Sequence, residues 1–249
     1  MVRQDIFRKI GVRKMNIPHK VFVLGFTKNP DAMERTCIEV ERIGLMPIRH
    51  WNFPTPYTKF VQKHIINANN AMKHSEAFFN SGWGHYSILS IARDLGDVPV
   101  FVVEDDCRFL KDIDILHHTL ECAPDDADLL LLDSFGATRS QEGFVNERKN
   151  VFRGWAKISA ARSAAAYIVG PRYINRLISL GDRCTRGKKA RIFDQWFENR
   201  WLEGANIYCA VPNLAVQAVD PVMANRPSAV SNQNKYKEIG LNMAKYAAW

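Results

Sequence analysis

The chain has 249 residues, of which 47% are hydrophobic and 11% aromatic, enough for one large core or two closely joined lobes. This composition excludes a fibrous or disordered protein, and no apolar run approaches the roughly 20 residues that a membrane-spanning helix needs. The basic N-terminus lacks the apolar core and cleavage site of a secretory signal, and five scattered cysteines without CxxC spacing favour free thiols. We therefore expect a protein kept in a reducing cytoplasm.

The net charge of +8 is unevenly distributed along the sequence. Residues 104–133 contain ten acidic residues against two basic ones, whereas residues 148–200 contain thirteen Lys or Arg against three acidic residues. This asymmetry indicates an acidic centre beside a basic face that could receive an anionic partner. A patchily charged surface without a partner is the simpler explanation for one basic stretch taken alone.

The first half of the chain predicts alternating strands and helices. The pattern predicts a strand at 20–26, a helix at 31–44 and an extended segment at 45–52. It then predicts a helix of mixed polarity at 59–80, followed by an amphipathic helix at 86–96 that ends at Gly96 and buries Ile88, Leu89, Ala92 and Leu95. Buried strands are predicted within 97–106 and 126–135. Such alternation is typical of an α/β protein with a parallel sheet.

The second half continues this pattern after a loop at 136–150. We expect a strand at 163–170, a helix from Pro171 that ends before Gly181, a basic loop at 183–191, a short helix at 193–204 and a strand at 206–212. The residues from Pro221 onward are polar and loop-like, with room for one terminal helix.

Three consecutive acidic residues, Glu104, Asp105 and Asp106, follow the apolar run at 100–103. In open α/β sheets ligands bind outside the carboxyl ends of the strands, so this strand would deliver carboxylates to the ligand. An unpaired cluster of this kind raises its own pKa values or binds a cation, and Mg²⁺ or Mn²⁺ prefers oxygen ligands. On these residues alone, a cap of the following turn is an alternative.

The stretch GWGHYSILSIARDLGDVPVFVVEDDCRF, residues 82–109, resembles glycosyltransferase family 25, the lipooligosaccharide and collagen galactosyltransferase type. Residues 21–45 and 163–178 are similar to further parts of that family, as are residues 193–217, which include Asp194 and end in Pro212-x-x-x-x-Gln217. The family usually has Ser-His before the acidic strand, whereas here Ser87 precedes Ile88 and His85 lies two residues earlier.

The resemblance implies a GT-A-like fold, an α/β architecture with a mostly parallel central sheet flanked by helices. It implies a single catalytic domain at 20–219, with a donor half at about 20–135 and an acceptor half at about 150–219. Residues 1–19 would form a basic N-terminal extension, and residues 220–249 a C-terminal tail.

The resemblance also implies a reaction, in which a hexose passes from a UDP-sugar to an acceptor hydroxyl with inversion, assisted by Mn²⁺ or Mg²⁺. Asp106 and Glu104 would bind the metal, and Asp194 would act as the general base, although a plain helix N-cap is the alternative for this aspartate. The residues implied to bind the donor are Glu104, Asp105, Ser87 and His85.

An anionic acceptor would be bound by basic residues before Asp194, namely Arg183, Arg186, Lys188, Lys189 and Arg191. Lipooligosaccharide or another glycan fits the family, whereas hydroxylated bases of DNA fit the charge equally well. Peripheral attachment to the inner face of an anionic membrane is a further expectation. A nucleic-acid-binding or membrane-binding module with a degenerate site is the non-enzymatic alternative.

Overall fold

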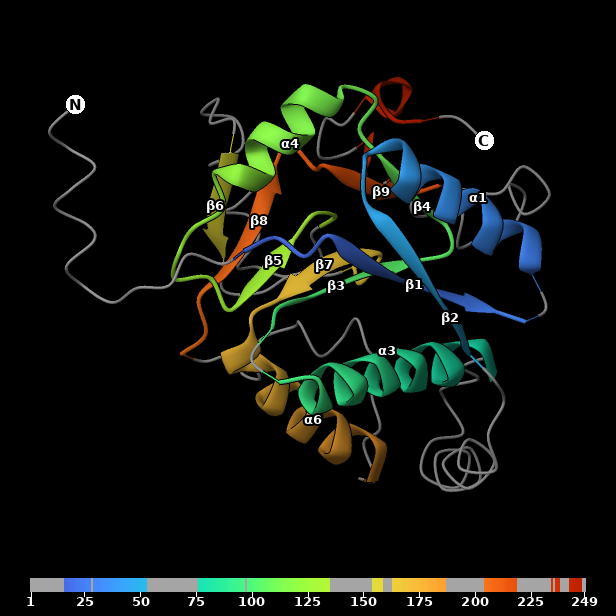
Figure 1. The fold of residues 1–249 in the computed structure, drawn as a ribbon, viewed down its shortest axis with the longest axis vertical. Helices are drawn as coiled ribbons and strands as arrows, with labels where there is room; N and C mark the ends of the chain where they lie inside the picture. Colours follow the sequence, from blue (N-terminus) through green and yellow to red (C-terminus); the bar gives the residue numbers. More distant parts are fainter. Residues whose placement is uncertain are drawn as a thin grey trace, which may run out of the picture.

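The computed structural model describes residues 16–27, 29–52, 76–96, 98–134, 154–158, 163–186, 204–218, 234, 236–237 and 242–247. Their strands and helices confirm the predicted α/β architecture, with a mostly parallel central sheet flanked by helices (Figure 1).

The central sheet is built from strands of both halves of the chain. Its described strands are β1 (Lys20–Phe26), β2 (Met46–Asn52), β3 (Val100–Glu104), β5 (Leu129–Leu131), β6 (Gly154–Ile158), β7 (Ala166–Val169) and β8 (Ile207–Val211), in the order β2-β1-β3-β7-β5-β8-β6. β1 is parallel to β2 and β3, and β5 is parallel to β8, whereas β7 is antiparallel to β3 and β5, and β6 to β8. Five strands therefore run in one direction, and β6 and β7 run against them.

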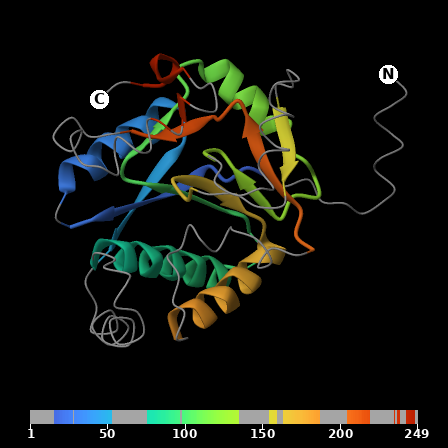
Figure 2. The same cartoon turned by 180° about the vertical axis from the view of Figure 1, so that it is seen from behind.

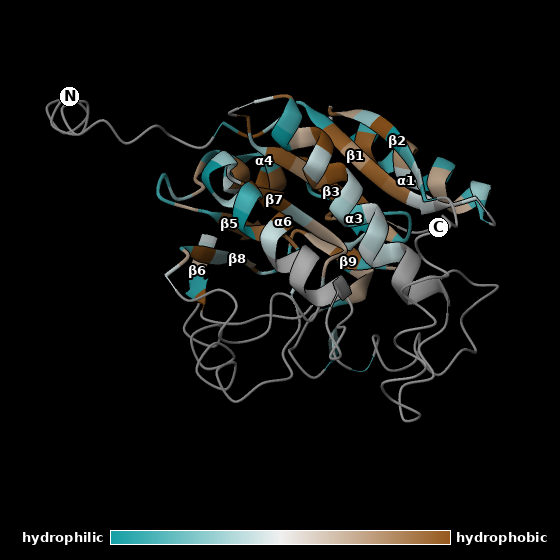
Figure 3. Cartoon of the chain, turned by 90° about the horizontal axis from the view of Figure 1, so that it is seen from below, coloured by the Kyte–Doolittle hydropathy of each residue, from teal (hydrophilic) through white to brown (hydrophobic). Residues whose placement is uncertain are grey.

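Helices cover both faces of this sheet. The helices α1 (Pro30–Arg42) and α4 (Ile113–Glu121) lie on one face, and α3 (Glu76–Asp94) and α6 (Pro171–Arg186) lie on the other (Figures 1 and 2). Along β3, Phe101 and Val103 join the core beneath α1, while Val100 and Val102 join the core beneath α3. A strand buried on both faces reads as an unbroken apolar run, which explains the hydrophobic band along the sheet in Figure 3.

The N-terminal half follows its local sequence signals closely. The side chain of Asn29 caps α1 by accepting a hydrogen bond from the Ala32 backbone N–H at 3.4 Å, and Pro30 occupies the first turn, where its missing N–H costs nothing. The apolar residues at helical spacing, Met33, Cys37 and Val40, are buried against the sheet. The predicted strands at 20–26 and 45–52 are confirmed as β1 and β2.

The helix α3 differs from its prediction at both ends. It is a single helix from Glu76, so residues 81–85, between the two helices predicted at 59–80 and 86–96, also lie inside it. A Cβ on Gly84 would overlap Leu24 Cδ1 and lie 3.2 Å from Asn52 Nδ2, so a glycine here lets α3 approach the sheet closely. Leu95 was wrongly predicted to be buried, because it lies beyond the last turn and is 66% exposed.

The helix α6 is longer than predicted. It continues through Gly181 to Arg186, so Arg183 and Arg186 lie in a helix and not in the predicted loop. An internal glycine costs about 1 kcal/mol, which the burial of Ile174 and Leu177 under the sheet outweighs.

Several short elements were not predicted. They are α4, β6 and a separate two-stranded antiparallel sheet of β4 (Cys107–Phe109) and β9 (Ala215–Gln217). β4 and β9 have three residues each, too few to show the alternation of a strand. The helix α4 did carry a start signal, because Asp112 caps it by accepting a hydrogen bond from the Ile115 N–H at 3.0 Å.

Other predictions concern residues outside the described part of the chain, namely most of the helix at 59–80, the loop at 136–150 and most of the helix at 193–204. The domain boundaries also stay a prediction, although strands from both proposed halves share one sheet. Within the described ranges, no helix combines the length and the apolar character needed to cross a membrane.

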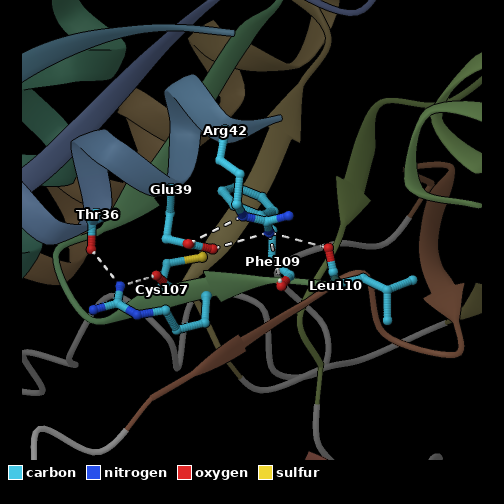
Figure 4. Close-up of polar contacts among 7 residues, drawn as sticks. Thr36, Glu39, Arg42, Cys107, Phe109 and Leu110 are labelled. Carbon is cyan, nitrogen blue, oxygen red and sulfur yellow. Dashed lines mark hydrogen bonds and ion pairs between the residues drawn. The ribbon is translucent and has the colours of Figure 1, made fainter. Parts of the chain in front are cut away.

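Arg42 joins α1 to the loop after β4 (Figure 4). Its guanidinium group donates to both carboxylate oxygens of Glu39, at 3.2 and 3.1 Å, and to the backbone carbonyls of Phe109 and Leu110, at 3.3 and 3.2 Å. Nε and Nη2 make these bonds with three N–H groups, so one N–H of Nη2 is shared between two acceptors. The planar fork faces both oxygens of the carboxylate at once, which a lysine ammonium cannot do.

We predict that Arg42→Lys lowers the free energy of unfolding by about 1 kcal/mol, because it leaves partly buried carbonyls without a donor. Arg49→Lys is the matched control, since Arg49 also forms a forked pair, with the exposed Glu34, but lies on the surface. Its effect should stay below about 0.5 kcal/mol. Urea denaturation of both variants tests this, and equal effects would contradict a structural role for the Arg42 bridge.

Candidate functional site

The three acidic residues form the turn between β3 and β4 at the carboxyl edge of the parallel strands. Glu104 is the last residue of β3, and Asp105 and Asp106 make the turn before Cys107 begins β4. The prediction of a strand that closes on these acids is confirmed for Glu104, while the following reversal into β4 was not foreseen.

Backbone contacts from both sides hold this acidic turn in place. The hydroxyl of Thr36, on α1, donates to the Asp105 carbonyl at 2.6 Å, and the Ala218 N–H donates to the Asp106 carbonyl at 2.7 Å. The end of β1 lies so close that a Cβ on Gly25 would be 3.1 Å from both Cβ and Oδ2 of Asp105. The position of the turn is therefore set by packing, not by the turn residues alone.

The carboxylate of Glu104 is held by three side chains from distant parts of the sequence. Its Oε1 atom accepts from the Ser81 hydroxyl and from His85 Nε2, both at 3.1 Å, and its Oε2 atom accepts from Gln217 Nε2 at 2.9 Å. A carboxylate can only accept, so Nε2 of His85 carries a proton, and Nδ1 of His85 is hydrogen-bonded to the Tyr167 hydroxyl at 2.9 Å.

These contacts keep Glu104 ionised. Burial by itself raises the pKa of Glu104, but the hydrogen bond and charge of His85, with the hydrogen bonds from Ser81 and Gln217, outweigh it and lower that pKa. Burial, together with the negative charge of Glu104, raises the pKa of the Tyr167 hydroxyl well above its usual value. His85 therefore lies between the ionised carboxylate of Glu104 and the phenol of Tyr167, which stays protonated.

Asp106 has the opposite environment. Its Oδ1 atom is buried and has no hydrogen-bond partner within the described part of the chain. Burial raises the pKa of Asp106 well above its usual value, and the negative charges of Glu104, Asp105 and Asp133 raise it further, against a smaller opposing effect of Arg108. A buried carboxylate oxygen without a donor is uncommon and costly, so this atom calls for a physical explanation.

A fourth carboxylate, Asp133, lies at the same edge and was not identified from the sequence. It follows β5, is fully buried, and accepts hydrogen bonds from the Ser163 hydroxyl at 2.5 Å, the Tyr236 hydroxyl at 2.8 Å and Asn213 Nδ2 at 2.9 Å. Ser163 has a φ of 97°, a region that favours glycine, and such strain persists where the surrounding structure enforces it. Only its position after the buried run at 129–132 could have indicated this carboxylate.

Arg108 is a buried cation beside the acidic turn. It is 1% exposed, and its Nη1 atom donates to the Thr36 hydroxyl at 3.0 Å and to the Cys107 carbonyl at 2.5 Å. Burial lowers the pKa of Arg108 from its usual value. Because Thr36 in turn holds the Asp105 carbonyl, Arg108 supports the turn mechanically as well as electrostatically.

The structure brings together only some of the residues predicted to bind a donor. Glu104 and His85 are in contact, and Asp105 and Asp106 lie beside them. Ser87 follows His85 by two residues on α3, which turns it to the other side of the helix, and the serine that contacts Glu104 is Ser81, one turn before His85. A role of Ser87 in donor binding stays a prediction.

The residues predicted for acceptor binding and proton transfer cannot be placed. Arg183 and Arg186 belong to α6, but their side chains lie outside the described part of the structure, as do Lys188, Lys189, Arg191 and Asp194 altogether. Among the described residues, no group of three or more His, Cys, Asp or Glu side chains is arranged to hold a metal ion.

No protein-family model and no curated protein matches this chain. The resemblance to glycosyltransferase family 25 therefore stays a prediction. Among solved structures, the chain is similar to mouse xyloside xylosyltransferase 1 in its apo form, with a TM-score of 0.31 and 8% sequence identity over 75% of this chain and 71% of that chain. A TM-score of this size carries no argument about activity.

We predict that Asp106→Asn stabilises the protein at neutral pH. When the pH rises above the ordinary pKa of aspartate, Asp106 ionises in the unfolded chain but stays protonated in the folded protein, so the wild type loses stability until the raised pKa is passed. The loss is about 1.4 kcal/mol for each unit by which the pKa is raised. The amide does not titrate and avoids this loss.

Urea denaturation between pH 3 and pH 8 measures the effect, with Asp125→Asn as the control because Asp125 is exposed in the loop before β5. The advantage of Asp106→Asn over the wild type should be smallest near pH 3 and should grow with pH. An advantage that is equally large at pH 3 would mean that the ionisation of Asp106 is not its cause.

Proposed function

We propose that the protein is a metal-dependent glycosyltransferase that moves a hexose from a UDP-sugar to a hydroxyl group of an anionic acceptor, with inversion. The acidic turn would bind the donor diphosphate together with Mn²⁺ or Mg²⁺. The proposal is supported by the site itself, and above all by the unpartnered Oδ1 atom of Asp106.

The surroundings of Asp106 are those expected of a residue that binds a cation. Burial and three neighbouring carboxylates raise the pKa of this aspartate, and the donors at the site are directed to Glu104 and Asp133 instead. A divalent cation would compensate the crowded negative charge and supply the missing partner for Oδ1. This reading explains why a costly arrangement of charges is built into the edge of the sheet.

The available ligands fit Mg²⁺ or Mn²⁺ better than zinc. Magnesium usually takes one or two protein carboxylates and fills its other positions with water and substrate phosphates, so it does not need a group of three protein ligands. Asp106 would be the main ligand, with Glu104 as the second, because Oε2 of Glu104 accepts one hydrogen bond and keeps a second lone pair. When bound, the metal would act as a Lewis acid toward the leaving diphosphate.

The chain's own residues would then orient the donor. Glu104 is kept ionised and fixed by Ser81, His85 and Gln217, so it can accept a hydroxyl group of the donor or share the metal. Asp105 would fix the turn, in agreement with its carbonyl contact to Thr36. Asp194 is our proposed general base for the acceptor hydroxyl.

The acceptor is proposed to be anionic because thirteen Lys or Arg stand against three acidic residues between 148 and 200. A phosphorylated glycan or glycolipid, reached in the cytoplasm or at the inner face of the membrane, would use Arg183, Arg186, Lys188, Lys189 and Arg191. Modification of hydroxylated bases in DNA is the second candidate, favoured by the same charge. Binding of duplex DNA that weakens steeply between 50 and 200 mM salt, on the order of a thousandfold, would favour it.

The donor site is tested by thermal unfolding with UDP, GDP, CDP and their sugars, each with and without Mn²⁺. A nucleotide at about 100 times its Kd should raise the Tm of the wild type by roughly 5–10 °C, and the rise should need the metal. Asp106→Asn should abolish the shift, and Asp125→Asn should retain it. Because Asp106→Asn is expected to be as stable as the wild type or more so, loss of the shift would report binding and not unfolding.

Two outcomes would count against the proposal. If folded wild-type protein shows no shift with any nucleotide, the glycosyltransferase assignment is wrong. If Asp106→Asn retains a metal-dependent shift, the chain binds nucleotides but Asp106 is not the ligand of the metal.

A further inference from the structure

The described residues near the C-terminus, 236–237 and 242–247, are called the C-terminal segment here, and residues 242–247 are docked where the chain leaves β4 (Figure 1). The Lys111 N–H donates to the Lys245 carbonyl at 2.9 Å, and the Ala247 N–H donates to the Phe109 carbonyl at 3.2 Å, so this segment adds to the chain that leaves β4. Two of its tyrosines, Tyr236 and Tyr246, are 0% and 4% exposed and belong to the core beneath α1.

Tyr236 connects two walls of the candidate site through its hydroxyl group. The hydroxyl donates to Asp133 Oδ2 at 2.8 Å and accepts from the backbone N–H of Gln217 at 2.8 Å. The side chain of Gln217 in turn donates to Glu104 Oε2 at 2.9 Å. The chain of contacts therefore runs from Asp133, which follows β5, through the C-terminal segment and β9 to the carboxylate at the end of β3.

The position of Gln217 depends on this hydroxyl. Without it, the Gln217 N–H would lose an acceptor in a partly buried place and Asp133 would lose one of its donors. β9 would keep its pairing with β4, but its end at Gln217 would be held by one hydrogen bond fewer. A small shift there moves the side-chain amide that, among the described residues, donates to Glu104 Oε2. Groups that orient a ligand residue in this way commonly affect affinity by 10-fold to 100-fold.

We propose that Tyr236 is a positioning residue, which holds Gln217 and through it sets the orientation of the Glu104 carboxylate for donor and metal binding. The C-terminal segment is then a structural part of the site and not an appendage. This inference rests on the proposed function in so far as it concerns a nucleotide and a metal.

Tyr246 offers a matched control within the same segment. It is also a buried tyrosine, and its hydroxyl donates to the Asn213 carbonyl at 2.6 Å, but it contacts neither Gln217 nor Asp133 in the described hydrogen bonds. Tyr236→Phe and Tyr246→Phe each remove one buried hydroxyl and keep the ring. A loss of general stability should therefore be similar in the two variants, and only a positioning role separates them.

The first measurement is titration calorimetry of the 249-residue chain with Mn²⁺ and UDP. Tyr236→Phe should weaken binding about 10-fold, whereas Tyr246→Phe should bind like the wild type. Unchanged affinity in Tyr236→Phe, or equal weakening in both variants, would overturn the proposal. If Tyr236→Phe fails to fold by circular dichroism, Gln217→Met breaks the same connection from its other end and should weaken binding equally.

The second measurement needs no ligand and is a double-mutant cycle in urea between each tyrosine variant and Glu104→Gln. The shifts in the urea midpoint should not be additive when Tyr236→Phe is combined with Glu104→Gln, because the two groups are mechanically linked. They should be additive when Tyr246→Phe is combined with Glu104→Gln. Additive shifts for Tyr236→Phe would overturn the positioning role. If the wild type binds no nucleotide, the proposed function fails, and this cycle still decides whether the coupling exists.

Discussion

The gathering of four carboxylates at one edge of the sheet is the constraint on which the rest of the site depends. Glu104, Asp105, Asp106 and Asp133 repel one another in a partly buried place, and a fold that brings them together must supply compensation. It does so unevenly, since donors surround Glu104 and Asp133, whereas no described residue donates to Oδ1 of Asp106. The Oδ1 atom of Asp106 therefore costs stability, whereas the carboxylates of Glu104 and Asp133 are compensated by hydrogen bonds. Such a local cost is expected where function and stability compete.

The compensating donors come from elements that only the folded topology brings together. Helix α3 supplies Ser81 and His85, β9 supplies Gln217, and the C-terminal segment supplies Tyr236. Close packing makes this possible, because Gly84 lets α3 lie against the sheet and Gly25 admits the acidic turn beside β1. The apolar core beneath the polar network thus holds the network in place. The polar atoms belong to helices and strands whose other faces are buried in that core.

This distribution explains which parts could be predicted from the sequence. Glu104 and His85 belong to one continuous motif, and strands β1, β3 and β7 carry strong apolar runs, so local pattern was sufficient for them. Gln217 reaches Glu104 across 113 residues and Tyr236 reaches Asp133 across 103, separations at which periodicity carries no information. Ser81, which contacts Glu104, was not identified from the sequence because the motif places Ser87, two residues after His85, in the same helix.

The place of β7 in the sheet has a consequence for how the protein can be made. This strand, from residues 166–169, is hydrogen-bonded on one side to β3 and on the other to β5, which both precede it in the chain. A nascent chain that has emerged only as far as β5 therefore carries two apolar strands with bare edges, and such edges invite association with other chains. A fragment that ends at β5 would therefore lack the strand that joins β3 to β5, because β7 comes later in the chain.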